Sequence, residues 1–382
     1  WDARPTNPQG PLADAARLAP GRFGAGAANT AQAELELHGH WSPRPGLTLA
    51  ANGLALQQRS PGGGVAGQGR VNELQASIDH AGWAASAGKK VVSWDVGYGF
   101  RPNDVVQQEQ RRSLLTNTLE GRPLLQLEHF GADSAATLVW VNPQRLNADA
   151  ADSRGAGESA LAARGYWRDG STDWFAFARA GAHTRGSLGL AIAQVPGEAW
   201  EWHASWRLMQ RHDGWDQIGS ATTPHPWATT TLGGASQWLL GAQWTGEWQQ
   251  SLMLEWWHDG TALSDTAWAG WTARNAQLRT ASLPPAAAAG ALAWQAPPLN
   301  SPSLRRDNLY LRLAWQPERW TLSADLLLQP RDQGAALGAA VQWQGERWRL
   351  NAALRRYVGP SEALLRQLPQ RQQGLLAATC AF

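Results

Sequence analysis

Two His-Asp-Gly triplets, at residues 212–214 and 258–260, are the clearest candidates for acid–base chemistry in this chain. A histidine held by a carboxylate can activate a nucleophile for hydrolysis. Both triplets lie where a segment of alternating apolar and polar residues ends and a connecting loop begins. Asp-Gly is common in turns at such positions. No serine stands at a spacing that would set up a relay from one strand face. We therefore predict no catalytic residue, and hydrolysis ranks last among the functions considered.

Metal and cofactor chemistry also lacks a sequence pattern. The remaining histidines show neither an HxxxH spacing nor a clustered carboxylate of the kind that binds zinc. We therefore predict no metal site and no cofactor.

A larger set of charged side chains lies on the polar face of segments that alternate apolar and polar residues. Its acidic members concentrate in the first half of the chain and its arginines in the last segments. In a common interior, opposite charges can orient polar solutes as they pass, or can pair and make the interior rigid. The candidate interior residues are Glu34, Glu36, Glu73, Asp79, Glu128, Glu201, Arg207, Glu255, Arg312, Asp325, Arg349 and Arg355, with His38 and His203 beside them.

The elements that carry these charges are hairpins with tryptophans at their turns. The repeated units are Ala242–Trp248, Ala314–Trp320 and Val341–Trp348. Alternation alone also fits a soluble β-sandwich, but a sandwich buries tryptophan near strand centres. Tryptophan at strand ends is typical of the aromatic girdle of a membrane barrel. The predicted girdle residues are Trp41, Trp200, Trp202, Trp244, Trp248, Trp315, Trp320, Trp343, Trp348 and Phe382.

The composition excludes several other architectures. The 382 residues include 24 Trp and 40 Gly but one Cys, so a scaffold held by internal disulfides is excluded. No apolar run approaches the ~20 residues that a membrane helix needs. The net charge is +2 and lysine occurs only at Lys89 and Lys90. Nothing resembles the long basic run that follows nucleic acid, so we predict no nucleic-acid partner.

The alternation predicts an all-β, antiparallel transmembrane barrel of about 18 strands, with 16 as the alternative. Short periplasmic turns and long external loops are expected to alternate, the long ones at 60–69, 93–122, 143–158, 210–233, 259–304 and 358–372. Residues 31–382 form the barrel, and the irregular residues 1–30 supply an extra strand, a plug or a periplasmic segment. Seventeen strands are identified, and because barrels of this kind have even numbers, the missing one is expected before residue 31. The expected strands are 31–41, 47–59, 70–82, 83–92, 123–131, 135–142, 159–168, 172–181, 184–194, 198–209, 234–246, 248–258, 305–316, 318–329, 334–345, 346–357 and 373–382.

Two stretches resemble known families. The final alternating segment, Gly374–Phe382, resembles the closing strand of Gram-negative outer-membrane barrels, which implies recognition of the terminal Phe by the barrel-assembly machinery. Residues 88–104, GKKVVSWDVGYGFRPND, resemble a stretch of porin-like proteins related to alginate-export barrels, with Lys90 and Asp95 in place of the usual Gln and Gly. Its charged residues are predicted either to line a pore mouth or to belong to a structured external loop. They are Lys89, Lys90, Arg101 and Asp104, with the polar Asn103 between the last two.

These features favour a location in the bacterial outer membrane, in contact with the lipid bilayer and lipopolysaccharide. The favoured function is a porin-like channel that passes polar or charged solutes or an exported product. The alternative is a scaffold barrel that houses or docks a partner protein through its lumen or external loops. The 259–304 loop, with Trp268, Trp271 and Trp294, favours that alternative because exposed Trp often anchors interfaces.

Overall fold

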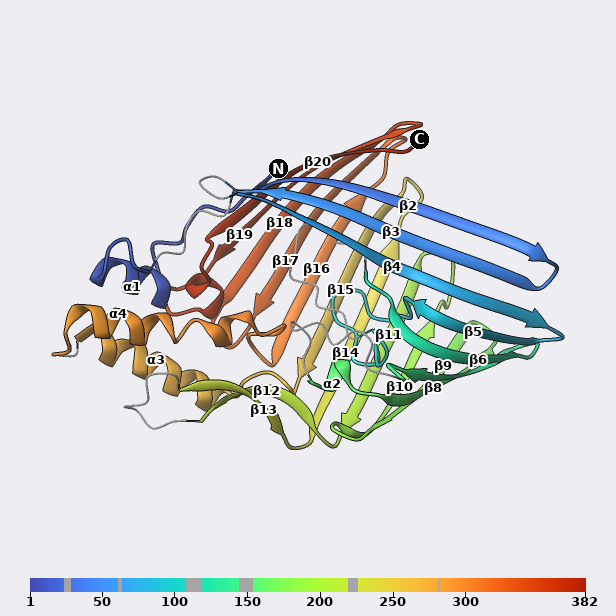
Figure 1. Cartoon of the computed structure of the whole chain (residues 1–382), viewed down its shortest axis with the longest axis horizontal. Helices are drawn as coiled ribbons and strands as arrows, with labels where there is room; N and C mark the ends of the chain where they lie inside the picture. Colours follow the sequence, from blue (N-terminus) through green and yellow to red (C-terminus); the bar gives the residue numbers. More distant parts are fainter. Residues whose placement is uncertain (24–28, 61–63, 108–118, 144–153, 219–225, 281) are drawn as a thin grey trace.

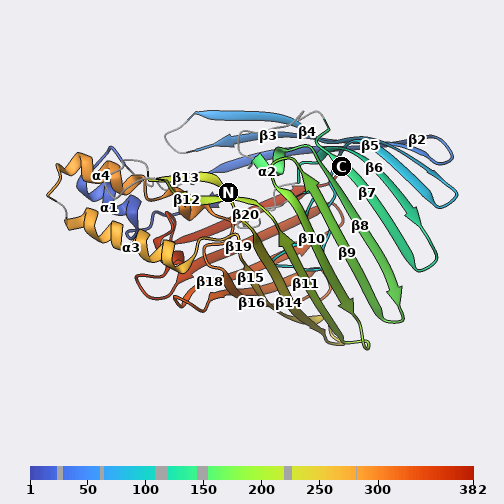
Figure 2. The same cartoon turned by 90° about the horizontal axis from the view of Figure 1, so that it is seen from below.

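The protein forms one antiparallel barrel with helices at one end (Figures 1 and 2). The computed structural model describes residues 1–23, 29–60, 64–107, 119–143, 154–218, 226–280 and 282–382. Within these residues, one sheet has 18 strands. Its strands are β1 (Asp2–Ala3), β2 (Ala31–Arg44), β3 (Leu47–Arg59), β4 (Val65–His80), β5 (Trp83–Lys90), β6 (Arg122–Phe130), β7 (Ser134–Val141), β8 (Ala160–Asp169), β9 (Thr172–Gly181), β10 (Arg185–Gln194), β11 (Trp200–Met209), β14 (Ala235–Thr245), β15 (Gln250–Asp259), β16 (Asp307–Trp315), β17 (Trp320–Gln329), β18 (Gly334–Gln344), β19 (Trp348–Val358) and β20 (Gln372–Cys380).

The predicted fold class is confirmed, including the count of about 18 strands. Each of the 17 expected segments corresponds to one long strand, and the segment 172–181 has the bounds of β9. The eighteenth strand is β1, which lies before residue 31 and pairs with β20. The expected loop 60–69 was too long, because β4 begins at Val65. The alternation did not predict this extension, because Gly67 and Gly69 stand on the outward face of the strand at positions where apolar side chains would be expected.

The strands present two different faces. On β10, Leu188 and Leu190 are 64% and 55% exposed, whereas the intervening Gly189 and the adjacent Ser187 and Ala191 point to the barrel interior, where Ser187 and Ala191 are buried. Alternate side chains of a strand point to opposite faces, so the apolar face of this strand covers the outside of the barrel. An outward apolar band is what a hydrocarbon environment requires of a transmembrane barrel.

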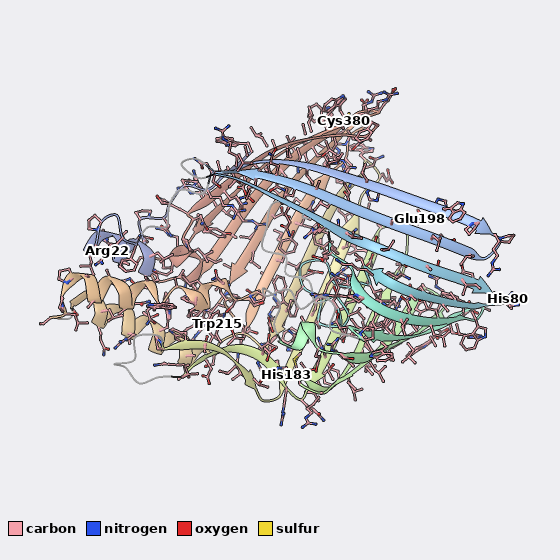
Figure 3. The ribbon with its side chains drawn as sticks, viewed as in Figure 1. Arg22, His80, His183, Glu198, Trp215 and Cys380 are labelled. Carbon is pink, nitrogen blue, oxygen red and sulfur yellow. The ribbon has the colours of Figure 1, made fainter. Side chains whose placement is uncertain are left out.

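The two ends of the barrel differ. At the turn end, neighbouring strands are joined by connections as short as Ala81–Gly82, and Gly46 adopts a φ of +77°. A Cβ at Gly46 would stand 2.5 Å from the Asp79 carbonyl oxygen, so this turn requires glycine. Trp200 and Trp320 are exposed at this end, where they pair with the partly buried Trp244 and Trp343. Figure 3 shows His80 at the turn end and His183 and Trp215 at the opposite, loop end.

The loop end carries a layer that we call the loop-end cap. It comprises α1 (Pro11–Leu18), α3 (Asp265–Thr280), α4 (Pro285–Ala293) and the hairpin of β12 (His212–Gln217) with β13 (Trp227–Leu232). Helix α1 packs on α4 (Figure 2), and Ala15, Leu278 and Leu292 form a buried cluster between the helices. The loops expected at 210–233 and 259–304 therefore contain regular structure. Within the described residues, no helix combines the length and apolar character needed to cross a membrane.

Candidate functional site

The connection after β5 turns into the barrel. We call its described part, residues 91–107, the inward loop. The alternation of β5 ends at Lys90, and Gly97, Gly99 and Pro102 follow within 12 residues. A side chain at Gly97 would overlap the Phe100 carbonyl oxygen, and one at Gly99 would stand 2.9 Å from a Glu255 carboxylate oxygen. These glycines let the loop backbone fold tightly and lie against the barrel wall.

The first anchor of the inward loop is Glu255 on β15, whose exposed fraction is 0%. Its carboxylate accepts hydrogen bonds from the backbone N–H groups of Tyr98 at 2.7 Å and Gly99 at 2.6 Å. His203 Nε2 on β11 lies 3.0 Å from the same carboxylate. A buried carboxylate needs such partners, because removing its charge from water is costly. Glu255 therefore couples the loop backbone to two strands of the wall.

The second anchor is Asn103, which reaches β10 and β11. Its Nδ2 donates to Ser205 Oγ at 2.8 Å and to the Trp206 carbonyl oxygen at 3.1 Å. Asp95 joins this contact, since its carboxylate accepts from Ser205 Oγ at 2.7 Å and from the backbone N–H of Asn103. Gly189 makes room for the asparagine, because a Cβ there would overlap Asn103 Oδ1.

The carboxyl group of Asp95 in the inward loop is largely shielded from water, and this changes its pKa. Desolvation raises the pKa of Asp95 above its ordinary value of 3.8. The hydrogen bonds from Ser205, Asn103 and Val96 act in the opposite direction but are the smaller effects.

Apolar side chains hold the rest of the loop. Trp94, Val105 and Val106 are buried in one cluster with Val139 and Phe177 from the facing strands. The Trp94 and Phe177 rings are 6.3 Å apart. The burial of several large apolar side chains favours the docked loop. The loop therefore fills the lumen along the wall made by β6 to β11.

A cluster of aromatic side chains lies on the side of the loop that faces β15 and β16. Tyr98 stacks on Tyr310 with 6.2 Å between ring centroids, and Phe100 stacks on Trp257 at 5.6 Å. The Arg312 guanidinium lies 5.3 Å from the centroid of the Tyr98 ring. Tyr98 keeps 40% of its surface exposed, so its ring borders the space that the loop leaves open.

The structure brings five of the predicted interior residues to the inward loop or its anchors. Glu73 Oε1 accepts from the Val91 N–H at 2.8 Å, and Arg207 donates to the Pro102 carbonyl oxygen at 3.1 Å. Glu255 is the first anchor, and Glu201 lies 3.5 Å from His203. Arg312 contacts the Tyr98 ring.

The other predicted interior residues lie apart from the inward loop. Arg312 pairs with Asp325 at 3.0 Å on the next strand. Glu36 accepts from Asn52 and lies 3.4 Å from His38, while Glu128 accepts from Thr137. Arg349 donates to Gln344 at the turn end. Glu34 on β2 accepts from Gln32, Asp79 lies on β4 and Arg355 lies on β19.

The four predicted pore-mouth residues divide into two groups. Lys89 pairs with Glu120 where β5 meets the next connection, and Lys90 Nζ lies 3.5 Å from Ser86 Oγ. Arg101 and Asp104 lie inside the barrel instead. Arg101 donates to the Gly97 carbonyl oxygen, and the buried Asp104 accepts from Ser93 and Trp94. Both residues stabilise the shape of the inward loop.

Ser205 and Arg179 were not predicted from the sequence. Arg179 is buried on β9 and donates to the carbonyl oxygens of Val105 and Gly155, so it ties the inward loop to a second external connection. Its position on the polar face of an alternating strand was a usable signal. Ser205 occupies a similar position, but a serine there carries no specific indication of a loop anchor.

The histidines considered for hydrolysis have structural contacts. His212 Nδ1 lies 2.9 Å from the Gly233 carbonyl oxygen, and His258 Nδ1 lies 2.8 Å from Asp307. Burial lowers the pKa of His212, which stands in the loop-end cap. His183 contacts both Asp213 and Thr231, but through the same Nε2, whereas a catalytic relay uses the two ring nitrogens separately. The described part of the chain contains no group of three His, Cys, Asp or Glu side chains that could hold a metal ion.

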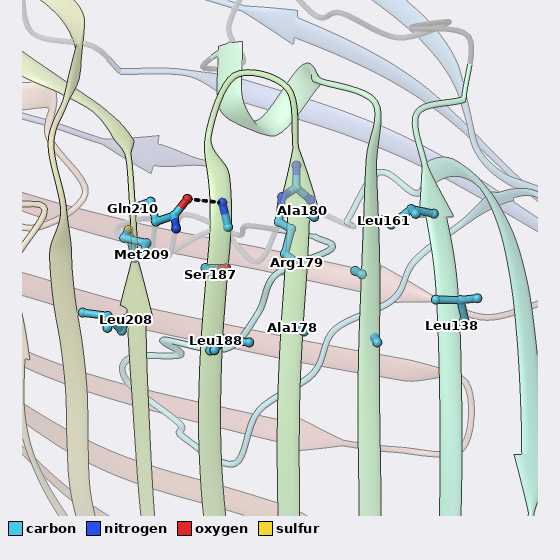
Figure 4. A pocket seen from close by; sticks show the side chains of 13 residues that line it. Leu138, Leu161, Ala178, Arg179, Ala180, Ser187, Leu188, Leu208, Met209 and Gln210 are labelled. Atoms are coloured by element: carbon cyan, nitrogen blue, oxygen red, sulfur yellow. Dashed lines mark hydrogen bonds between the residues drawn. The ribbon is translucent and has the colours of Figure 1, made fainter.

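A groove of about 490 Å³ lies on the outer face of β7 to β11 (Figure 4). Leu138, Leu161, Leu188 and Leu208 border it, and Gln210 accepts a hydrogen bond from the Gly186 N–H at its rim. The four leucines are exposed on the outward face. The groove therefore belongs to the apolar exterior and not to the lumen.

No protein-family model and no curated protein matches the chain. Among solved structures, OccAB3 of Acinetobacter baumannii is similar with a TM-score of 0.54 at 9% identity, over 100% of this chain and 96% of that chain. Salmonella typhi OmpF in complex with daunomycin gives a TM-score of 0.46 at 10% identity, over 92% and 90% of the two chains. A mutant of Rh. blastica porin gives 0.42 at 10% identity, over 93% and 92%.

The similarity to OccAB3 extends over the whole chain, and it concerns the fold. The apolar outer face, the tryptophans at the turn end and the long loops at the other end are the features of outer-membrane barrels. The chain therefore has the antiparallel barrel fold of outer-membrane proteins, and this architecture points to the bacterial outer membrane.

Proposed function

We propose that this protein is an outer-membrane channel for polar or charged solutes, narrowed by its inward loop. The observation that carries the proposal is the double anchoring of residues 91–107 to the inner wall, through Glu255 and through Asn103. A loop fixed inside a barrel narrows the lumen without blocking it. Solutes would then pass between the loop and the opposite wall.

Charged side chains support a preference for polar solutes. Arg312 and Asp325 are about one-quarter exposed although they pair with each other, so solutes in the lumen can reach them. Arg207 lies beside the second anchor, and the other predicted interior residues that do not hold the loop lie on β2, β4, β6 and β19. We propose that these groups line the passage and make it selective for the charge of the solute.

The outer surface supports the proposed membrane contacts. The exposed tryptophans at the turn end would form the girdle at the periplasmic interface, and the loop end would meet lipopolysaccharide. Phe382 is 93% exposed at the end of the closing strand, where the barrel-assembly machinery could bind it. The proposed relation to alginate-export barrels rests on residues 88–104, most of which belong to the inward loop.

Docking of a partner protein is the second candidate function. It is favoured by the loop-end cap, in which Trp294 and Leu283 are exposed beside a buried tryptophan cluster. Exposed aromatic side chains of this kind are typical anchors of interfaces. A docking barrel would require a partner to bind this cap, whereas the channel requires none.

Solute entry into proteoliposomes tests the channel. The purified barrel should speed the entry of neutral, cationic and anionic solutes of one size to different extents, because the lumen is charged. A variant with Arg312→Gln should change the ratio of anion to cation entry and leave neutral entry nearly unchanged. Entry no faster than into empty liposomes would contradict the proposal.

A further inference from the structure

The guanidinium group of Arg179 on β9 joins the inward loop to an external connection. Its Nη1 donates to the Val105 carbonyl oxygen at 2.7 Å, and its Nη2 donates to the Gly155 carbonyl oxygen at 2.9 Å. The side chain is 2% exposed, and the buried Glu158 carboxylate lies 3.6 Å from Nη2. Because the donors of a guanidinium are fixed relative to one another in one plane, a displacement of Gly155 disturbs the contact with Val105.

Gly155 is itself held from the outer side. It belongs to the short helix α2 (Arg154–Gly157) in the external connection before β8. Its backbone N–H donates to Asp213 Oδ2 at 2.8 Å, and Asp213 Oδ1 lies 2.7 Å from His183 Nε2. Asp213 is the carboxylate of the first His-Asp-Gly triplet and stands on β12, with its side chain 7% exposed. One residue, Gly155, therefore connects Asp213 at the loop end with Arg179 inside the barrel.

The hairpin of β12 and β13 continues from Asp213 to the helices of the loop-end cap. Trp227 on β13 donates from Nε1 to Gln295 Oε1 at 2.9 Å. Its ring is buried in one cluster with the two tryptophans of α3, and Trp215 on β12 packs against that cluster. Figures 1 and 2 show the hairpin between these helices and α2. The two strands pair over their whole described length, so the hairpin can transmit a displacement from one end to the other.

We propose that the β12–β13 hairpin is a strut through which the helices of the loop-end cap control the docking of the inward loop. The path runs from the tryptophan cluster along the hairpin to Asp213, Gly155, Arg179 and Val105. While the helices hold the hairpin in place, Arg179 keeps its contact with the loop. Because coupling between two sites is reciprocal, release of the loop should also loosen the cap. The inference concerns the position of the inward loop and does not depend on conduction.

The charge of Arg179 is held independently of this path. The Glu158 carboxylate beside it also accepts a hydrogen bond from the His183 N–H at 2.7 Å. Loss of the Asp213 carboxylate should therefore leave Arg179 paired in the wall, because a buried guanidinium without a counter-charge is costly. What is lost is the constraint on Gly155, and through it the alignment of the guanidinium with the loop.

Hydrogen–deuterium exchange of the full barrel in proteoliposomes tests the coupling, with mass spectrometry reporting on residues 91–107. Asp213→Ala should speed exchange of the loop amides about 10-fold, the equivalent of roughly one hydrogen bond. Asp216→Ala is the matched control, because Asp216 stands on the same strand but is exposed and accepts from the next residue, Gln217. Native exchange of the loop in a folded Asp213→Ala barrel would overturn the proposal.

Arg179→Lys tests whether the coupling passes through the guanidinium. Lysine keeps the charge beside Glu158, but its single ammonium group does not reproduce the planar fork that reaches both carbonyl oxygens. We expect faster loop exchange in Arg179→Lys and no further increase when Asp213→Ala is added. Additive effects would overturn the proposal, because independent sites add.

Trp227→Phe extends the test to the cap and serves alone if Arg179→Lys fails to fold. It keeps an aromatic ring but removes the donor to Gln295. Exchange of residues 91–107 should rise in Trp227→Phe and should not rise further in the double variant with Asp213→Ala. An increase confined to the cap would show that the cap and the inward loop move independently.

Discussion

Replacing Glu255 by Gln should loosen the inward loop while the barrel stays intact. The carboxylate accepts from the N–H groups of Tyr98 and Gly99 and contacts His203, all in a fully buried position. The amide keeps one acceptor oxygen and presents an NH₂ group at the other position. One backbone N–H then loses its acceptor and faces a donor.

The size of the effect follows from that one contact. A hydrogen bond to a charged group contributes ~1.5–3 kcal/mol. Since each 1.4 kcal/mol changes an equilibrium tenfold, the ratio of docked to released loop should fall about 10- to 100-fold. The barrel strands keep their own hydrogen bonds, so heat-modifiable migration on detergent gels should be unchanged.

Single-channel recording in planar bilayers measures this effect. The Glu255→Gln channel should spend about 10- to 100-fold more time in a level of higher conductance than the native channel, as the ratio above requires. Glu201→Gln is the matched control, because Glu201 is 41% exposed, lies 3.5 Å from the same histidine and does not touch the loop backbone. A folded Glu255→Gln channel with native conductance and noise would refute the anchoring role.

Three further outcomes follow from the contacts of the site and the cap. Gly189→Ala should displace Asn103 and release the second anchor, giving more high-conductance events, whereas Gly165→Ala, with its nearest contact at 4.0 Å, should not. Because the pKa of Asp95 is raised in the docked loop, the docked state binds its proton more tightly than the released state does. Docking should therefore weaken as pH rises from about the ordinary value of 3.8 through the raised value, and recordings across this range should show Asp95→Asn removing that dependence. Trp268→Ala removes a buried ring of the loop-end cap, at a cost of ~3–5 kcal/mol, so external protease should cleave residues 259–306 faster while the barrel remains resistant.

The long strands could be predicted from the sequence because their signals are local. The strand pattern of β9 and β17 lies in ten consecutive residues each, and the turns beside them carry Gly or Pro. Period-two alternation reports which face is apolar without any knowledge of the neighbours. Strand β1 could not be found in this way, because two residues contain no period.

The inward loop could not be predicted because its determinants are distant in sequence. Tyr98 and Glu255 are 157 positions apart, and Asn103 and Ser205 are 102 apart. The glycines of residues 97–99 indicated a tight backbone, but nothing local distinguished a loop inside the lumen from an external one. Helix α3 is a different case: Trp268, Trp271, Asn275 and Leu278 are buried at helical spacing, a pattern that the sequence contains.

The current through the purified native barrel in a planar bilayer tests the central claim most directly. The proposed channel should give steady single-channel currents without any added partner, with an ion selectivity that Arg312→Gln alters. A correctly folded, heat-modifiable barrel that carries no current would contradict the channel and favour the docking function of the loop-end cap.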